Sequence, residues 1–116
     1  MAPGTVIALC GELGAGKSEF ARAFVRHFLP HATVPSPTFT LVQPYYADRA
    51  TIWHFDLYRV KSPAELVELG IDEARRGIVL VEWPDRAPDL LETAHVLVSI
   101  TVGPDGSRNI TIRDNR

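Results

Sequence analysis

Alternation between hydrophobic and polar positions divides the chain into short strands and amphipathic helices. Residues 5–10 form a nearly continuous apolar run, which predicts a central strand covered on both faces. A helix is predicted over residues 17–28, because Phe20, Phe24 and Phe28 recur four residues apart and place an apolar stripe on one side. The chain therefore begins with a strand that leads through a glycine-rich loop into a helix.

Later segments add more strands and a second helix. The segment "SPAELVELG" predicts a helix with Ser62 as N-cap, Pro63 at its first position, Glu65 at its third, and Gly70 beyond its end. Strands are predicted at about residues 38–42, 51–58 and 77–83, and in a closing hairpin of residues 95–102 and 108–113 around "GPDG". This order predicts one α/β domain over residues 1–116, a three-layer or incomplete three-layer arrangement with a mixed sheet.

Composition places the chain among globular proteins, with 46% hydrophobic and 22% charged residues. No apolar run approaches the roughly 20 residues of a membrane span, and the first residues lack the basic start of a signal peptide. Cys10 is the single cysteine, so no intrachain disulfide can form. We therefore expect a cytoplasmic protein without a membrane partner.

Charge is distributed unevenly along the chain. Residues 62–95 contain eight acidic and three basic side chains, a balance of −5, whereas the whole chain carries −2 and the remainder therefore +3. This acidic segment is either a solvated face or a docking surface for a more basic partner. The net charge gives no electrostatic indication of direct nucleic-acid binding.

The string "GELGAGKS" at residues 11–18 satisfies the phosphate-loop (Walker A) pattern G-x-x-x-x-G-K-[ST]. Its glycines let backbone N–H groups converge on an anion, and the following helix adds its N-terminal donors. Lys17 is expected to bridge the β- and γ-phosphates, and the Ser18 hydroxyl to bind Mg²⁺. ATP is favoured over GTP, because no guanine-reading N-K-x-D string occurs. The predicted nucleotide-binding residues of this P-loop are Gly11, Glu12, Leu13, Gly14, Ala15, Gly16, Lys17 and Ser18.

Two carboxylates follow predicted strands and are candidates for the metal and for the attacking water. Glu82 ends the apolar run of residues 78–81, which is the Walker B pattern, and Asp56 ends a run that His54 interrupts. In an open α/β sheet the carboxyl ends of strands line the ligand crevice, so both acids are expected there with Lys17 and Ser18. The alternative for each is a surface carboxylate at a strand exit.

The remaining candidates are less specific. Ser36 and Thr38 lie in a loop where such folds sense the γ-phosphate, although an ordinary proline turn has the same composition. Trp83 is expected in the core more than at the site. The four histidines have no zinc-site spacing.

Several strings together resemble the TsaE (YjeE) family: "GELGAGKS", "SPTFTLV", "HFDLYR", "ELGI" and "LVEWPD", in this order over about residues 5–100. Members of that family are small bacterial ATPases required to make threonylcarbamoyladenosine (t⁶A) in tRNA. The resemblance implies binding of ATP and Mg²⁺, slow or partner-dependent hydrolysis, docking on a TsaD–TsaB pair, and contact with tRNA only through that pair. Matching residues are Gly14, Gly16, Lys17 and Ser18 of the phosphate loop, Ser36, Pro37 and Thr38 of a switch-like loop, and the acids Asp56 and Glu82.

The chain departs from the family's pattern in three places. A strand and a helix usually precede the phosphate-loop strand and contribute to the adenine pocket, whereas here that strand is predicted at residue 5. Glu19 replaces a threonine after the loop and is expected to weaken phosphate binding unless it points away or pairs. Glu12 stands where Asp is common, which is a mild change.

Two other functions use the same loop. A small-molecule or nucleotide kinase needs an acceptor pocket and an arginine-bearing lid, but after Glu82 the sequence predicts only a loop and a hairpin. Arg75, Arg76 and Arg86 would make a poor lid. A non-catalytic nucleotide-binding module is the third possibility, since Glu19 and the short N-terminal segment would reduce the affinity for ATP.

Overall fold

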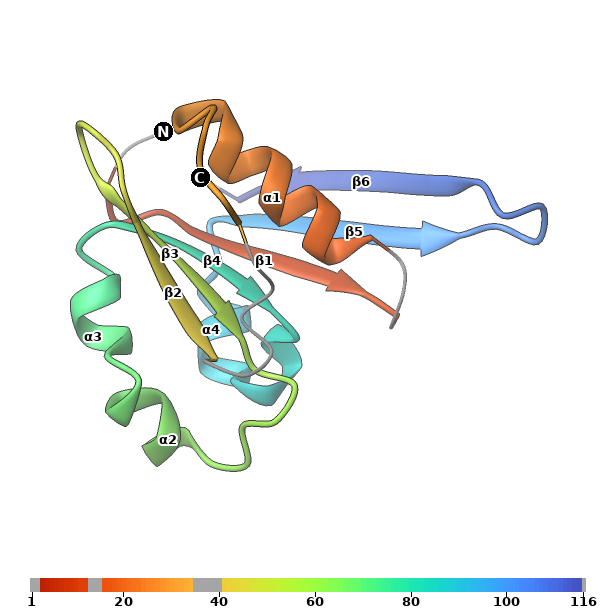
Figure 1. Cartoon of the computed structure of the whole chain (residues 1–116). Coiled ribbons are helices and arrows are strands. Elements are labelled where there is room, and N and C mark those ends of the chain that lie inside the picture. Colours follow the sequence, from red (N-terminus) through yellow and green to blue (C-terminus); the bar gives the residue numbers. More distant parts are fainter. Residues whose placement is uncertain (1–2, 13–15, 35–40, 116) are drawn as a thin grey trace.

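The computed structural model describes residues 3–12, 16–34 and 41–115. Within these ranges the chain forms six strands and four α-helices, with one short 3₁₀-helix (Figure 1). In chain order the elements are β1 (Val6–Gly11), α1 (Lys17–Phe28), β2 (Val42–Tyr46), β3 (Thr51–Asp56), α2 (Pro63–Glu68), α3 (Ile71–Ala74), β4 (Ile78–Glu82), η1 (Pro84–Arg86), α4 (Pro88–Glu92), β5 (Val96–Val102) and β6 (Arg108–Asp114).

The strands make one mixed sheet in the order β2-β3-β4-β1-β5-β6. The four inner strands are parallel, and an antiparallel strand closes each edge. β1, which leads into the glycine loop, therefore lies near the centre of the sheet between β4 and β5. The mixed sheet and the closing β5–β6 hairpin confirm the sequence-based predictions.

Helices cover both faces of the sheet, so the predicted three-layer arrangement is correct (Figure 1). Along β1, Ile7 and Leu9 pack with Ala21 and Val25 of α1. The alternate residues of β1 face the other side, where they join buried side chains of α2, α3 and α4. Because β1 is buried on both faces, its sequence is continuously apolar rather than alternating.

The second predicted strand was placed too early in the chain. Prediction ended it at Val42, whereas β2 begins at Val42 and continues to Tyr46. Pro44 lies inside β2 and obscures the strand signal in the sequence. The position is tolerated because β2 is an edge strand. Residues 38–40 of the predicted strand lie outside the described residues.

The segment after Glu82 is more helical than predicted. It was expected to be only a loop and a hairpin, but η1 and α4 precede the hairpin. Pro84 and Pro88 occupy first positions of these helices, where the missing N–H of proline costs nothing. Both prolines were interpreted as loop residues, and α3 was also missed because it has only four residues.

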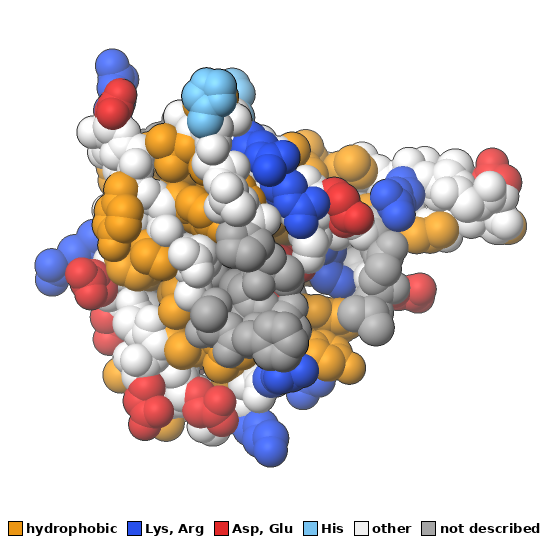
Figure 2. Space-filling view, in the orientation of Figure 1, with side chains coloured by type: hydrophobic (Ala, Val, Ile, Leu, Met, Phe, Trp, Pro, Cys, Tyr) orange, Lys and Arg blue, Asp and Glu red, His pale blue; other side chains and the backbone are white. Residues whose placement is uncertain are grey.

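The acidic residues of the segment 62–95 differ in their exposure to solvent. Glu82 is buried at 3% exposure and belongs to the interior, so it does not contribute to a surface charge. Figure 2 shows acidic side chains (red) over the part of the surface where α2 lies. The exposed acids on α2, α3 and α4 are Glu68, Asp72, Glu73, Asp89 and Glu92. No described helix combines the length and the apolar character needed to span a membrane.

Candidate functional site

The two predicted acids lie side by side at the carboxyl edge of the sheet. Asp56 is the last residue of β3 and Glu82 the last residue of β4, and the two are register partners. Glu82 is also paired in register with Leu9, two residues before the glycine loop. The parallel strands thus place both carboxylates beside that loop, as the strand-end argument predicts.

Lys17 is buried at the first position of α1, with 5% of its surface exposed. Its ammonium group donates hydrogen bonds to the carbonyl oxygens of Gly11 and, over 3.1 Å, of Glu12. Burial lowers the pKa of Lys17, while Glu82 and Asp56 counter this effect by favouring the charged form. The lysine is therefore held by carbonyl oxygens at the end of β1 and just after it, with both candidate acids close enough to act on its charge.

Glu82 is held from both sides. Ser18 Oγ donates to Glu82 Oε1 over 3.2 Å, and His54 Nε2 lies 2.6 Å from Glu82 Oε2. These two contacts connect the first turn of α1 with β4 and β3. The sequence indicates His54 only as an interruption of an apolar run and as one of four histidines without zinc-site spacing. Its signal was period-two alternation, which places it on the same face of β3 as Asp56.

Asp56 makes a different contact. Its Oδ1 accepts a hydrogen bond of 3.0 Å from the backbone N–H of Tyr58, so the carboxylate shapes the turn that follows β3. The Tyr58 ring packs against the Trp83 ring, with centroids 4.9 Å apart. The Arg86 guanidinium lies over the Tyr58 ring at 5.7 Å. Asp56 is thus connected to Trp83, the residue after Glu82, through Tyr58.

Trp83 belongs to both the core and the site, whereas the sequence favoured the core alone. It is partly buried against the cluster on the face of the sheet that α2, α3 and α4 cover. Its ring centre lies 4.0 Å from Lys17 Nζ. Its φ of 57° is in the left-handed region, which is rare for a bulky residue and costs energy. Trp83 directly follows Glu82, and with this backbone conformation its indole ring lies over the Lys17 ammonium group.

Gly16 has a φ of 110° and caps the N-terminus of α1. A Cβ at this position would lie 3.6–3.7 Å from side-chain atoms of Arg108, which comes from β6. Sequence reasoning missed this second cation beside the loop, because only the folded hairpin brings residue 108 to residue 16. Glu19 is exposed in the first turn of α1. Leu13, Gly14, Ala15, Ser36, Pro37 and Thr38 lie outside the described residues, so their predicted roles stay predictions.

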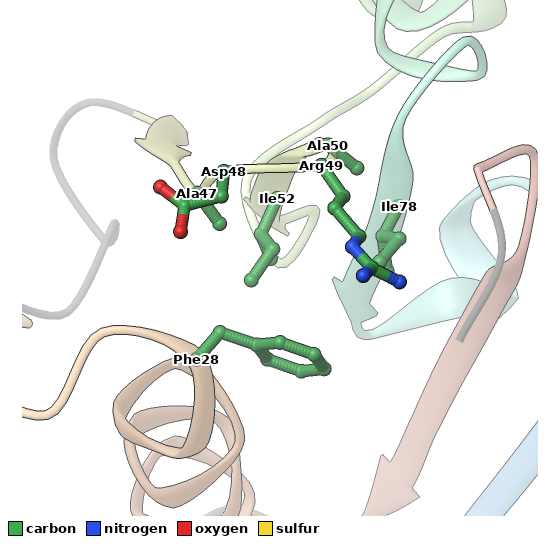
Figure 3. A pocket seen from close by; sticks show the side chains of 7 residues that line it. All are labelled: Phe28, Ala47, Asp48, Arg49, Ala50, Ile52 and Ile78. Atoms are coloured by element: carbon green, nitrogen blue, oxygen red, sulfur yellow. The ribbon is translucent and has the colours of Figure 1, made fainter.

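Two pockets differ in their relation to this site. One of about 310 Å³ is lined by the end of α1 and the β2–β3 turn (Figure 3). It includes Ile78, the first residue of β4, and is therefore at the opposite end of that strand from Glu82. A second pocket of about 250 Å³ adjoins the glycine loop and is lined by Gly11, Glu12, Ile100, Thr101 and Val102.

Comparison with known proteins places the chain beside one family. The family model described as threonylcarbamoyl adenosine biosynthesis protein TsaE matches residues 1–110. The chain is 41% identical to the tRNA threonylcarbamoyladenosine biosynthesis protein TsaE of Rickettsia felis, over 97% of this chain and 67% of that protein. It is 38% identical to the protein of the same name from Haemophilus influenzae, over 92% of this chain and 68% of the relative. The chain thus spans about two thirds of the length of these relatives.

A solved structure has the same fold. The crystal structure of YdiB from Bacillus subtilis superposes with a TM-score of 0.78 at 30% sequence identity. The match covers 98% of this chain and 70% of that one. The sheet and the helices described for this chain therefore correspond to an architecture already seen in a natural protein.

Proposed function

Because the chain belongs to the TsaE family, we propose that it is a cytoplasmic ATP-binding and ATP-hydrolysing subunit of the machinery that makes t⁶A in tRNA. It acts through a TsaD–TsaB-like pair and reaches tRNA only through that pair. The observation that carries the proposal is the contact between Ser18 and Glu82 beside the buried Lys17. A cation, a hydroxyl and a carboxylate close together at one edge of the sheet are groups that would bind the terminal phosphates of a nucleoside triphosphate and their metal ion.

Phosphate binding falls to the loop and the start of α1. Lys17 is already oriented by the Gly11 and Glu12 carbonyl oxygens, so little side-chain entropy is lost when phosphate arrives. The N-terminal N–H groups of α1 add donors and a favourable dipole. Arg108 adds positive charge near the same helix end. The pocket beside Gly11 and Glu12 would then receive the nucleoside.

The donors at the sheet edge fit Mg²⁺, which prefers oxygen ligands and usually takes one or two from the protein besides phosphates and water. Ser18 and Glu82 touch each other and would hold the ion together. Such an ion neutralises charge that develops on the β- and γ-phosphates during transfer. Asp56, one strand farther from β1, would accept a hydrogen bond from the attacking water and orient it.

The decisive experiment is ATP hydrolysis by the chain alone and with a TsaD–TsaB pair. We expect slow hydrolysis alone, stimulation by the pair, and loss of about 100-fold or more in Lys17→Ala. Reconstituted t⁶A formation on tRNA should show the same dependence on Lys17. If the pair neither binds nor stimulates the chain, or if ATP is consumed only with a small-molecule acceptor, the proposal is wrong.

A further inference from the structure

His54 occupies a position where an apolar side chain would be expected. It is 1% exposed and points into the layer between the sheet and α1, where its strand neighbour Ile52 and its register partner Leu80 are fully buried. Burying an imidazole costs free energy unless its polar atoms are satisfied. Core packing alone therefore does not explain why a histidine is buried at this point of β3.

The explanation lies in its contact with Glu82. The distance of 2.6 Å between Nε2 and Oε2 is that of a short hydrogen bond. Because a carboxylate oxygen can only accept, this bond requires the ring tautomer that carries its proton on Nε2. Among the described residues, Nδ1 has no hydrogen-bond partner. The ring is thus committed to Glu82 alone, and nothing else in the described part of the chain uses its polarity.

The other carboxylate oxygen is turned toward the phosphate loop. Glu82 Oε1 accepts from Ser18 Oγ while Oε2 is held by His54, so the carboxylate has one orientation. We propose that His54 is a positioning residue that holds the Glu82 carboxylate toward Ser18, so that the metal-binding oxygens are arranged before the ion arrives. The inference rests on the proposed function, since it assigns Ser18 and Glu82 to the metal of the bound nucleotide.

This role has a specific consequence. Without an N–H donor at the Nε2 position, Glu82 can rotate away from Ser18, and the site must be ordered when the metal binds. Loss of such an outer contact typically weakens metal binding 10–100-fold. Binding of nucleotide without metal depends on Lys17 and the loop, so it should change little. A histidine that only filled space would not separate these two affinities.

The test uses three substitutions in the full chain. His54→Gln carries an amide N–H about as far from the backbone as Nε2, His54→Asn carries it too close to the strand, and His54→Leu removes it. Mn²⁺ serves as the metal probe, with its affinity measured by electron paramagnetic resonance in the presence of ADP. ADP affinity in EDTA and the melting temperature are measured on the same samples.

We expect His54→Leu and His54→Asn to bind Mn²⁺ 10–100-fold more weakly, with ADP affinity in EDTA within about twofold of the wild type. His54→Gln should recover most of the Mn²⁺ affinity. The Gln and Asn pair decides the question if the Leu variant does not fold. Equal Mn²⁺ affinity in all variants, or equal losses with and without metal, would overturn the positioning role. A wild-type protein that binds no Mn²⁺–ADP would instead refute the proposed function.

Discussion

The Lys17 ammonium group lies 4.0 Å from the centre of the Trp83 ring, so the lysine proposed to bind phosphate is in direct contact with the residue after Glu82. A cation over an indole face is stabilised by the ring quadrupole, and the contact also shields Lys17 from water. Trp83 further contacts Tyr58, which follows Asp56 by two residues. If nucleotide binds at the loop as proposed, its phosphates would therefore lie close to this tryptophan.

Trp83 fluorescence should report nucleotide binding. The chain has two tryptophans, so Trp53→Phe leaves Trp83 as the single emitter. We expect the emission of that variant to change in intensity and wavelength on titration with Mg²⁺–ATP, because phosphate bound at Lys17 changes the electric field at the adjacent indole ring. Adding Lys17→Ala should abolish the response. A flat titration, with binding confirmed by calorimetry, would show that Trp83 does not sense the phosphate site.

Replacing Lys17 by methionine should stabilise the nucleotide-free protein while abolishing ATP binding. Burial lowers the pKa of Lys17 from its ordinary value of 10.5. The folded state therefore binds this proton less tightly than the unfolded state, and the charge opposes folding below the lowered pKa. The penalty decreases as pH rises through the lowered value toward 10.5. Lys17→Met removes this penalty, so the free energy of unfolding of the variant should exceed that of the wild type at pH 7. The difference should become smaller at higher pH.

Urea denaturation at several pH values measures this difference. Lys61→Met is the matched control, because Lys61 is the other lysine and its side chain is exposed. It should leave the stability within about 0.5 kcal/mol of the wild type at each pH. A gain from Lys17→Met that grows with pH would contradict the burial argument.

Charge-neutral replacements of the two acids should separate their roles. Glu82→Gln is expected to weaken Mn²⁺ binding in the presence of ADP by at least about tenfold, since Glu82 contacts Ser18 directly. Asp56→Asn should retain most Mn²⁺ affinity and lose mainly kcat, because Asp56 is assigned to the water. Metal titration and steady-state hydrolysis with the TsaD–TsaB pair give both quantities. The reverse pattern would exchange the two assignments.

Gly77 limits the approach of β4 to β3. A Cβ there would lie 2.2 Å from the backbone oxygen of Thr51, a clash that no side-chain rotation relieves. Gly77→Ala should therefore cost about 3 kcal/mol of unfolding free energy. Gly70→Ala, where a Cβ meets no atom but φ is 86°, should cost only about 1–2 kcal/mol. Equal effects in chemical denaturation would show that strand spacing at Gly77 adjusts freely.

Local patterns in the sequence were sufficient for much of the fold. The limits of α1 were predicted at Lys17 and Phe28, because the spacing of three phenylalanines marks an apolar stripe. In the structure Ala21 and Val25 beside this stripe are buried, and Phe20 and Phe24 pack partly against the same cluster. The strands that end at Asp56 and Glu82 were predicted from the apolar runs that precede these two acids. Prediction failed where a local signal had two meanings: Pro44 lies in an edge strand, and Pro88 begins a helix rather than extending a loop.

The sequence by itself determined that a phosphate-loop motif precedes an amphipathic helix and that two acids each end a strand. Those features are local, since backbone angles, helix capping and burial periodicity act within a few residues. Only the tertiary structure decided that His54 holds Glu82, that Trp83 covers Lys17, and that Arg108 lies beside Gly16. These contacts join segments up to 92 residues apart in the sequence. Strand order and register bring them together, and the spacing of residues along the chain encodes neither.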